Sequence, residues 1–305
     1  MKTVDEKELK EFIKIKGKDN IDWEDISRRK LSETFIRNYN SYLNLESIAK
    51  YQTLSEDFIY DYRNKLKWEI VSRYQTLSEE LIANKYTSKV DWKLISRYQK
   101  LSEDFIYTYR KKVNWSYIVK YQILSEDFIV KAKKYIVWKE VARYQGTNLS
   151  VQFTKEYFNS LDVDSVCRYI KLSPEFMNEF KDKLNWEIIS QYQTLSEKSM
   201  EEFSDYIDWH IISRYQKLSE KFIKDHKNKL EWDYISQYQT LSDEFIIAFA
   251  SKINWDILSG RTLSESILRQ FYKKINWKTV FINQKLSSDI INEFYTQIKN
   301  DIKNG

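Results

Sequence analysis

Residues that break helices are scarce in this chain. Its 305 residues include four glycines and one proline, both far below ordinary usage. So few breakers predict a chain that is almost entirely helical. The sequence also lacks a long apolar run, and residues 1–16 are charged throughout. We therefore expect neither a secretory signal nor a membrane-spanning segment.

Side chains that could perform chemistry are equally scarce. The single cysteine, Cys167, excludes an internal disulfide and is typical of a reducing compartment, so we expect a cytoplasmic protein. Other repeats have serine or alanine in its place, which favours a packing role. The only histidines, His210 and His226, lie in different predicted helices. No glycine-rich phosphate loop, metal-binding cluster or nucleophile elbow is present, so we expect no enzyme, no cofactor and no metal site.

What the chain does contain is one segment repeated about twelve times at a period of roughly 23 residues. Residues 101–122, LSEDFIYTYRKKVNWSYIVKYQ, represent it well. A tryptophan, or an aliphatic residue in its place, recurs at Trp23, Leu45, Trp68, Trp92, Trp115, Trp138, Val163, Trp186, Trp209, Trp232, Trp255 and Trp277. A Leu-Ser pair recurs at the same period between these positions.

Each copy predicts two short helices. Ser102 is a good N-cap for a first helix that is closed by residues 110–112, and Asn114 caps a second helix from Trp115 to Gln122. Pro174 falls on the first position of a predicted helix, where proline is tolerated. Because two short helices cannot bury their own apolar faces, neighbouring copies must stack.

The predicted fold is therefore all-α: an α-solenoid of about twelve stacked helix-turn-helix repeats. We expect one solenoid over residues 1–305, with repeats from about 22 to 294 and a change of curvature at residues 146–148. The polar tail at 296–305 is expected to fray.

Two recurring positions are predicted to be structural. The tryptophans are expected to belong to the core, because Leu45 and Val163 replace them. A glutamine that stands seven residues after nine of these twelve positions should be partly buried. We interpret these glutamines as a ladder that bonds the following turn, since a buried amide needs partners.

A third recurring position, five residues after each tryptophan, is predicted to face solvent and is usually arginine or lysine. A row of tyrosines follows it directly. The candidate residues for partner binding in these two rows are Arg73, Arg97, Lys120, Arg143, Arg168, Arg214, Tyr98, Tyr121 and Tyr144.

The basic row allows two interpretations. Basic grooves with aromatic side chains hold single-stranded nucleic acids, so the row could offer one binding set per repeat. Alternatively, it is a solvated or protein-facing row. An acidic residue stands four positions before the cation in some repeats, as at Glu24, Glu46, Glu69 and Asp164, an order that forms helix ion pairs. The first of the two helices in each copy begins with acidic residues and in most copies ends with basic ones. Stacking therefore also predicts two edges of opposite charge, either of which could dock a charged partner.

The recurring sequence pattern, LSEDFI followed by N/D-W-x-x-I-S-x-Y-Q, resembles short helical repeats in uncharacterised proteins of phages and giant DNA viruses. The resemblance covers residues 22–294. It implies a viral or mobile-element origin, hence the host cytoplasm as the location, and no catalytic residues.

The sequence as a whole predicts a non-enzymatic scaffold that binds a partner protein along an extended surface. In a viral setting that partner would be a host factor, such as a defence component, that the scaffold sequesters or inhibits. Single-stranded nucleic-acid binding along the Arg/Lys and Tyr rows is the alternative.

Overall fold

The computed structural model describes the backbone of residues 6–304 and the side chains of residues 6–300. Throughout that range the chain forms short helices and no β-strand, which confirms the all-α prediction. The described helices include none that is long and apolar enough to cross a membrane. Residues 1–5, where the sequence predicts no secretory signal, and Gly305 lie outside the described part.

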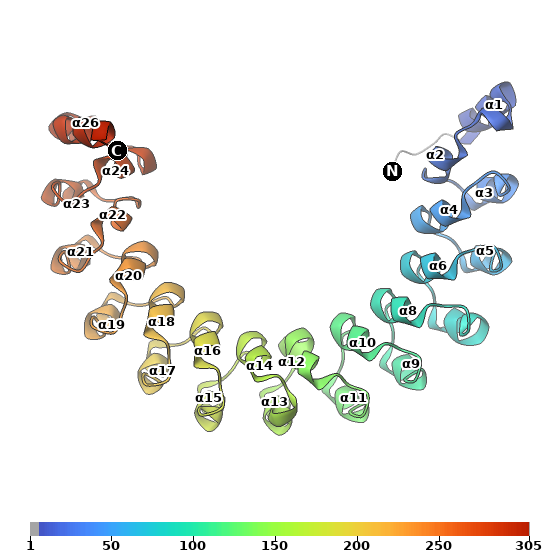
Figure 1. Cartoon of the computed structure of the whole chain (residues 1–305), viewed down its shortest axis with the longest axis horizontal. Coiled ribbons are helices and arrows are strands. Elements are labelled where there is room, and N and C mark those ends of the chain that lie inside the picture. The colour runs from blue at the N-terminus through green and yellow to red at the C-terminus, as the bar shows by residue number, and fades with distance from the viewer. Residues whose placement is uncertain (1–5, 305) are drawn as a thin grey trace. The chain divides into compact units, whose positions relative to one another are not determined.

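The chain divides into two compact units, residues 1–162 and 163–305, each of which is a stack of helix pairs. We call the helix after each Leu-Ser pair a first helix and the helix that starts at the tryptophan position a second helix. Consecutive second helices pack side by side within each unit, as an α-solenoid requires. Within either unit, the second helices lie on the inner side of the curve and the first helices on the outer side (Figure 1).

The helices of the first unit follow one another without long connections. Its first helices are α3 (Glu33–Tyr39), α5 (Glu56–Asp61), α7 (Glu79–Leu81), α9 (Glu103–Thr108), α11 (Glu126–Lys131) and α13 (Val151–Tyr157). Its second helices are α2 (Trp23–Ser27), α4 (Leu45–Tyr51), α6 (Trp68–Tyr74), α8 (Trp92–Tyr98), α10 (Trp115–Tyr121) and α12 (Trp138–Gln145). It also contains α1 (Glu6–Lys16), η1 (Lys18–Asn20), η2 (Ile82–Tyr86), η3 (Gly146–Asn148) and η4 (Phe158–Ser160).

The second unit repeats the same arrangement. Its first helices are α15 (Pro174–Phe180), α17 (Glu197–Glu202), α19 (Glu220–Asp225), α21 (Asp243–Ala248), α23 (Glu265–Gln270) and α25 (Ser288–Glu293). Its second helices are α14 (Val163–Tyr169), α16 (Trp186–Tyr192), α18 (Trp209–Tyr215), α20 (Trp232–Tyr238), α22 (Trp255–Leu258) and α24 (Trp277–Asn283). The last helix is α26 (Tyr295–Asn304).

Local capping sets the helix boundaries. The Ser102 hydroxyl accepts a hydrogen bond from the amide of Phe105, and the Asn114 side chain accepts one from the amide of Tyr117. Pro174 occupies the first turn of α15, as predicted. The first helices are shorter than predicted. In the representative repeat α9 ends at Thr108, so the basic residues 110–112 lie in the turn that follows it.

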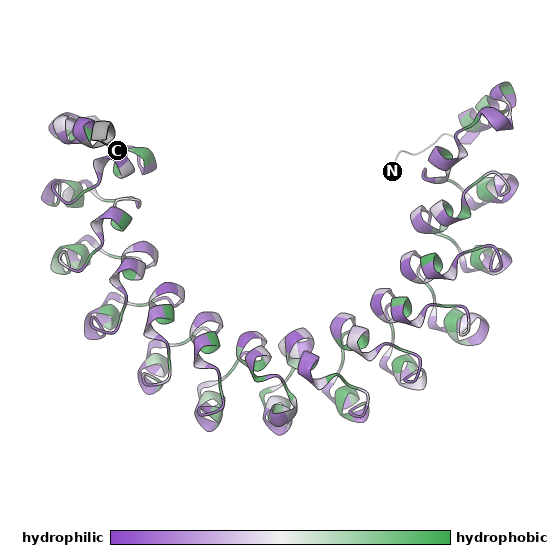
Figure 2. Cartoon of the chain, in the orientation of Figure 1, coloured by the Kyte–Doolittle hydropathy of each residue, from purple (hydrophilic) through white to green (hydrophobic). Residues whose placement is uncertain are grey.

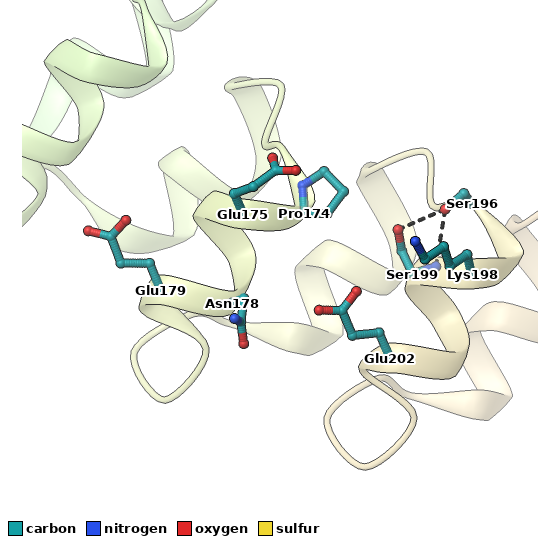
Figure 3. A pocket seen from close by; sticks show the side chains of 8 residues that line it. All are labelled: Pro174, Glu175, Asn178, Glu179, Ser196, Lys198, Ser199 and Glu202. Carbon is teal, nitrogen blue, oxygen red and sulfur yellow. Dashed lines mark hydrogen bonds between the residues drawn. The ribbon is translucent and has the colours of Figure 1, made fainter.

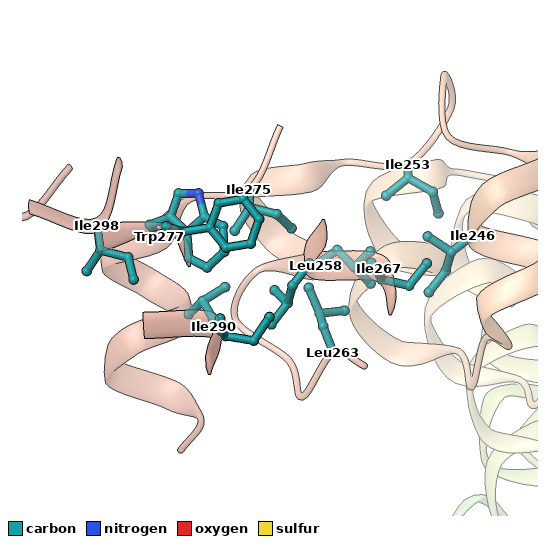
Figure 4. Packing of buried hydrophobic residues seen from close by; sticks show 12 residues of the cluster. Ile246, Ile253, Leu258, Leu263, Ile267, Ile275, Trp277, Ile290 and Ile298 are labelled. Atoms are coloured by element: carbon teal, nitrogen blue, oxygen red, sulfur yellow. The ribbon is translucent and has the colours of Figure 1, made fainter. Parts of the chain in front are cut away.

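The core of each unit lies between its first and second helices. Apolar residues gather where helices face one another, and hydrophilic residues cover the remaining surface (Figure 2). Phe58 and Ile59 on α5 are fully buried, as is Val71 on α6. In the second unit, Leu258, Ile267 and Ile290 belong to one continuous apolar cluster that reaches Trp277 (Figure 4).

The tryptophans contribute to this packing from its edge. Most are half-buried, and each contacts aromatic rings of the first helix or turn that follows it. Trp92, for example, lies with its ring centroid 5.0 Å from that of Tyr109, and its indole N–H donates to the Thr87 carbonyl. Both the rings and the indole N–H are thus engaged within the fold, but only Trp186 and Trp277 are buried as the core prediction requires.

The expectation that the tail frays is wrong. Residues 295–304 form α26, which packs against α24 and α25. Ile298 is buried in the apolar cluster that contains Trp277 and Phe294. Ile298 lies a helical turn after Phe294 and continues the apolar face of the last repeat, which fixes the helix against it.

The glutamine ladder exists, but its direction is opposite to the prediction. Gln99 is buried, and its side-chain oxygen accepts a hydrogen bond from the amide of Leu77 at 3.0 Å. Its amide group donates to the carbonyls of Ser72 and Gln75, at 3.0 and 2.8 Å. These partners belong to the preceding repeat and not to the following turn. Each glutamine therefore bonds its own second helix to the end of the preceding second helix and to the loop that follows that helix.

The ladder lacks its glutamine in three repeats. Lys30 occupies the glutamine position after α2. Ile170 occupies the glutamine position at the end of α14, and its side chain has no carboxamide group. In the shortened repeat around α22, Arg261 takes over, donating to the carbonyls of Ser236 and Gln239 at 2.9 and 2.6 Å. Burial lowers the pKa of Arg261, but these two carbonyls stabilise the guanidinium.

A second set of contacts between repeats was not predicted. The carboxylate of Glu103 accepts hydrogen bonds from the amide and the hydroxyl of Ser125, the N-cap residue of the next first helix, at 2.6 and 2.9 Å. The same contact joins Glu220 to Ser242. The signal was available in the sequence, because a glutamate or aspartate directly follows most of the Leu-Ser pairs.

Replacing Glu103 by alanine is expected to destabilise the first unit by about 1 kcal/mol, because two charge-assisted bonds are lost at an exposed site. The control is Asp104→Ala, since Asp104 contacts only the distant Lys131 ammonium at 3.7 Å. Urea denaturation followed by circular dichroism should show a clearly lower midpoint for the first variant alone. Equal midpoints would show that these contacts do not couple repeats.

Candidate binding surface

The predicted rows of cations and tyrosines lie on the inner side of each unit, on the exposed face of the second helices. Arg97 and Lys120 are exposed, and Tyr98 and Tyr121 are close to two-fifths exposed. The opposite face of most second helices is occupied by a buried isoleucine or valine and a buried small residue, such as Ile95 and Ser96. Burial of that face leaves the positions five and six residues after the tryptophan open to solvent.

In the first unit, cations and tyrosines alternate continuously. The Arg97 guanidinium lies 5.0 Å from the ring centroid of Tyr98, in its own repeat, and 5.1 Å from that of Tyr121, in the next. Lys120 bridges Tyr121 and Tyr144 in the same way, at 5.3 and 5.2 Å. The series of cations that lie over rings begins at Lys50 and continues through Arg73, Arg97, Lys120 and Arg143. We call this series the cation–tyrosine row.

The second unit has a less regular version of the row. Arg168 lies 4.1 Å from the ring centroid of Tyr192, and Arg214 lies over the rings of Tyr215 and Tyr238 at 5.1 and 5.9 Å. Gln191 and Gln237 replace the cation in the repeats between and after them. A cavity of about 400 Å³ opens beside Arg168 and Tyr192, so the row is not flat at this point.

The tyrosines hold the cations in place and favour their charged form. Hydrogen bonding to the hydroxyls of Tyr144 and Tyr121 raises the pKa of Lys120. The nearby Tyr215, followed by Tyr238 and Tyr234, raises the pKa of Arg214. A cation over a tyrosine ring gains about 0.5–1 kcal/mol at an exposed site. The row is therefore a pre-arranged line of positive charge.

The predicted ion pairs within single helices form only once in the described part of the chain. Glu24 and Arg28 pair at 3.0 Å. Glu46 instead pairs with Lys67 of the next repeat, and Lys50 and Arg73 lie over tyrosine rings. The i, i+4 prediction is thus wrong for Lys50 and Arg73, whose cations lie over tyrosine rings of their own and the next repeat instead.

Glu24 also bonds to the next repeat, which makes its contribution depend on pH. Hydrogen bonds from Asn44 and Ser47, and then from Arg28, lower its pKa. A lowered pKa stabilises the fold above the pKa of the unfolded chain, and that stability is lost as the pH falls through the folded value.

Glu24→Gln is therefore expected to lower the melting temperature at about pH 7, and the difference from wild type should shrink below about pH 4. Thermal unfolding across that range measures it. Asp19→Asn, on the same unit, is a matched control. A difference that stays constant with pH would contradict the assignment.

The other polar residues singled out in the sequence have structural surroundings. His226 replaces an aromatic residue and stacks on Trp209 and Phe222, at 5.0 and 4.2 Å between ring centroids. His210 is exposed beside Tyr234, and Cys167 is fully buried. No group of three or more histidine, cysteine or acidic side chains suited to a metal ion occurs in the part of the chain that the structure describes.

A groove on the first-helix side marks an irregular pair of repeats. It has a volume of about 360 Å³ and lies between α15 and α17 (Figure 3). Pro174 stands where other repeats have the glutamate that bonds the next N-cap serine. Ser199 stands where they have phenylalanine, and the hydroxyls of Ser199 and Ser196 lie 2.7 Å apart. The groove thus follows from two missing side chains.

Some carboxylates of the acidic edge predicted along the first helices form contacts between repeats. Its first carboxylate in most repeats, such as Glu103, bonds the next serine, while the second, such as Asp104, remains exposed. The cation–tyrosine row has no comparable structural use beyond its own stacking. It is the surface with the strongest case for a partner.

Comparisons of the chain with models of known protein families, with curated proteins and with solved structures find no match.

Proposed function

We propose that this protein is a non-enzymatic scaffold that binds a partner protein along the inner face of its second helices. The observation that carries the proposal is the cation–tyrosine row. It is continuous from Lys50 to Tyr144, exposed, and held in register by contacts between repeats. Tyrosine and arginine are, with tryptophan, enriched among the residues that dominate protein interfaces, and tyrosine offers a large contact area with few rotamers to fix.

The resemblance to repeats of phages and giant DNA viruses supports a narrower proposal. In that setting the partner is a host protein, such as a defence factor, that the scaffold sequesters or inhibits in the host cytoplasm. An extended row of similar repeats suits capture, because many weak contacts add along the surface.

Single-stranded nucleic-acid binding is the second candidate, and the positive charge of the row favours it. The state of the tyrosines weighs against it. Base stacking needs a free ring face, whereas Tyr98 and Tyr121 each have two cations over the ring. We therefore rank protein binding first.

Affinity capture from an extract of the source or host cells, with and without nuclease, tests this proposal. The bait is the full chain, and the parallel bait carries Tyr74→Ala, Tyr98→Ala and Tyr121→Ala. A protein that survives nuclease and is lost from the second bait is the expected result. Material that disappears with nuclease would favour the second candidate, and capture by both baits alike would place the binding surface elsewhere.

A further inference from the structure

We propose that the second helices α8, α10 and α12 form the docking site for an acidic protein segment. This inference rests on the proposed function and names the part of the row and the chemistry of the partner. It is carried by a difference in charge between successive repeats of the first unit, which share the same backbone arrangement.

We compare the positions one, two, five, six and eight residues after the tryptophan position, most of which are exposed or half-buried. Leu31, Ser47 and Gly146 are the buried ones among them. In α2, α4 and α6 these positions hold four cations and four carboxylates. In α8, α10 and α12 they hold six cations and one carboxylate. The six cations are Lys93, Arg97, Lys100, Lys120, Lys139 and Arg143. We call this stretch the basic patch.

The basic patch has little internal neutralisation. Its one carboxylate, Glu140, accepts a hydrogen bond from the Ser116 hydroxyl at 2.8 Å. Lys93 and Arg97 both lie over the ring of Tyr117, at 5.7 Å. Cations that rest on rings instead of carboxylates keep their full charge available to a partner. The cations of the patch repel one another, and relieving that repulsion requires negative charge from a partner.

An apolar side chain lies within the same stretch. Ile123 is 85% exposed, at a position where other repeats have threonine or lysine. A simple polyanion makes no apolar contact with an exposed isoleucine, whereas a protein segment can place an apolar side chain against it. Together with the covered tyrosine rings, Ile123 favours an acidic protein segment over a nucleic acid.

The spacing of the repeats suggests how the acidic residues of the partner recur. Packed helices lie about 8–10 Å apart, so the cations of successive second helices should follow at about that interval. An extended chain rises about 3.3 Å per residue. A segment with a carboxylate at every third residue therefore matches the patch.

The test uses a labelled peptide with a glutamate at every third position and one leucine near its centre. Two further probes are the same peptide with glutamine for glutamate and a labelled oligothymidylate. Fluorescence anisotropy measures the binding of each probe to the full chain at low and at physiological ionic strength. The patch variant carries Arg97→Glu, Lys120→Glu and Arg143→Glu.

The control variant carries Lys111→Glu, Lys133→Glu and Lys134→Glu. It has the same net charge and changes two of the same three repeats, but its three exposed lysines lie in the turns after the first helices α9 and α11. A third variant, Arg97→Lys with Arg143→Lys, keeps the charge and tests for loss of the fold or the ring contacts. Thermal unfolding of each variant confirms that it folds.

The glutamate peptide should bind the wild-type chain, and the patch variant should weaken its Kd at least about tenfold. The control and lysine variants should stay within about threefold. An equal loss in the patch and control variants, or no binding of the glutamate peptide at low ionic strength, would overturn the inference and leave the proposed function in place. If oligothymidylate binds more tightly than the peptide, and only through the patch, the result would overturn both the inference and the proposed function.

Discussion

Replacing Gln99 by leucine is expected to lower the free energy of unfolding of the first unit by about 2–4 kcal/mol. The substitution removes three hydrogen bonds and leaves the amide of Leu77 without its partner in a buried place. An unsatisfied buried polar group costs about 1–3 kcal/mol, and leucine repays part of it through apolar contact. Urea denaturation followed by circular dichroism measures the change.

The matched control for this prediction is Gln237→Leu. It makes the same chemical change on a second helix, but the side chain of Gln237 is exposed. We expect its free energy of unfolding to stay within about 0.5 kcal/mol of wild type. If Gln99→Leu were as mild as the control, the glutamine ladder would contribute nothing to the coupling of repeats.

Phe58→Ala is expected to destabilise the first unit by about 3–5 kcal/mol, because it leaves a cavity in a closed part of the core. Phe58 is fully buried on α5, with its ring centroid 4.3 Å from that of Tyr62. In a solenoid such a loss weakens one layer and both of its interfaces. We therefore expect a broader unfolding transition as well as a lower midpoint.

Tyr60→Ala serves as the control, since it also truncates an aromatic residue on α5. Tyr60 is 43% exposed and contacts Arg63 and Lys85 through its ring. Its loss should cost no more than about 1 kcal/mol. Similar effects of the two substitutions would contradict the division between the buried and the exposed face of the first helices.

Local features of the fold were predictable from the sequence. N-caps such as Ser102 and Asn114, and the place of Pro174, depend on residues within one turn of each other. The periodicity of the apolar residues also predicted helices that must stack. These signals are short-range, so one copy of the repeat contains all the information needed.

Contacts between repeats were harder to predict. A helical wheel places Gln99 on the buried side, but it does not say which neighbour the amide meets, and the predicted direction was wrong. The bond from Ser125 to Glu103 spans 22 residues, so only the recurrence of an acidic residue after the Leu-Ser pair, and no rule within one helical turn, indicates it. Ile298 was missed because its polar neighbours concealed one apolar residue that continues the face of Phe294.

The candidate surface was predicted as two parallel rows, and the structure adds how they interact. Arg97 and Tyr121 belong to successive repeats, and only packing brings the guanidinium over the ring. That contact changes the interpretation of the tyrosines, because a covered ring is a poor platform for a base. The sequence could place both side chains on the surface but could not show that they stack.

The most direct test of the central claim is photo-crosslinking with benzoylphenylalanine, placed in turn at Tyr98, at Tyr121 and at Tyr60 of the first helix α5. The three tyrosines are similarly exposed, and only the first two belong to the cation–tyrosine row. In an extract treated with nuclease, we predict a protein crosslink from Tyr98 and Tyr121 and none from Tyr60. A crosslink from Tyr60 alone, or none from the row, would contradict binding along the inner face.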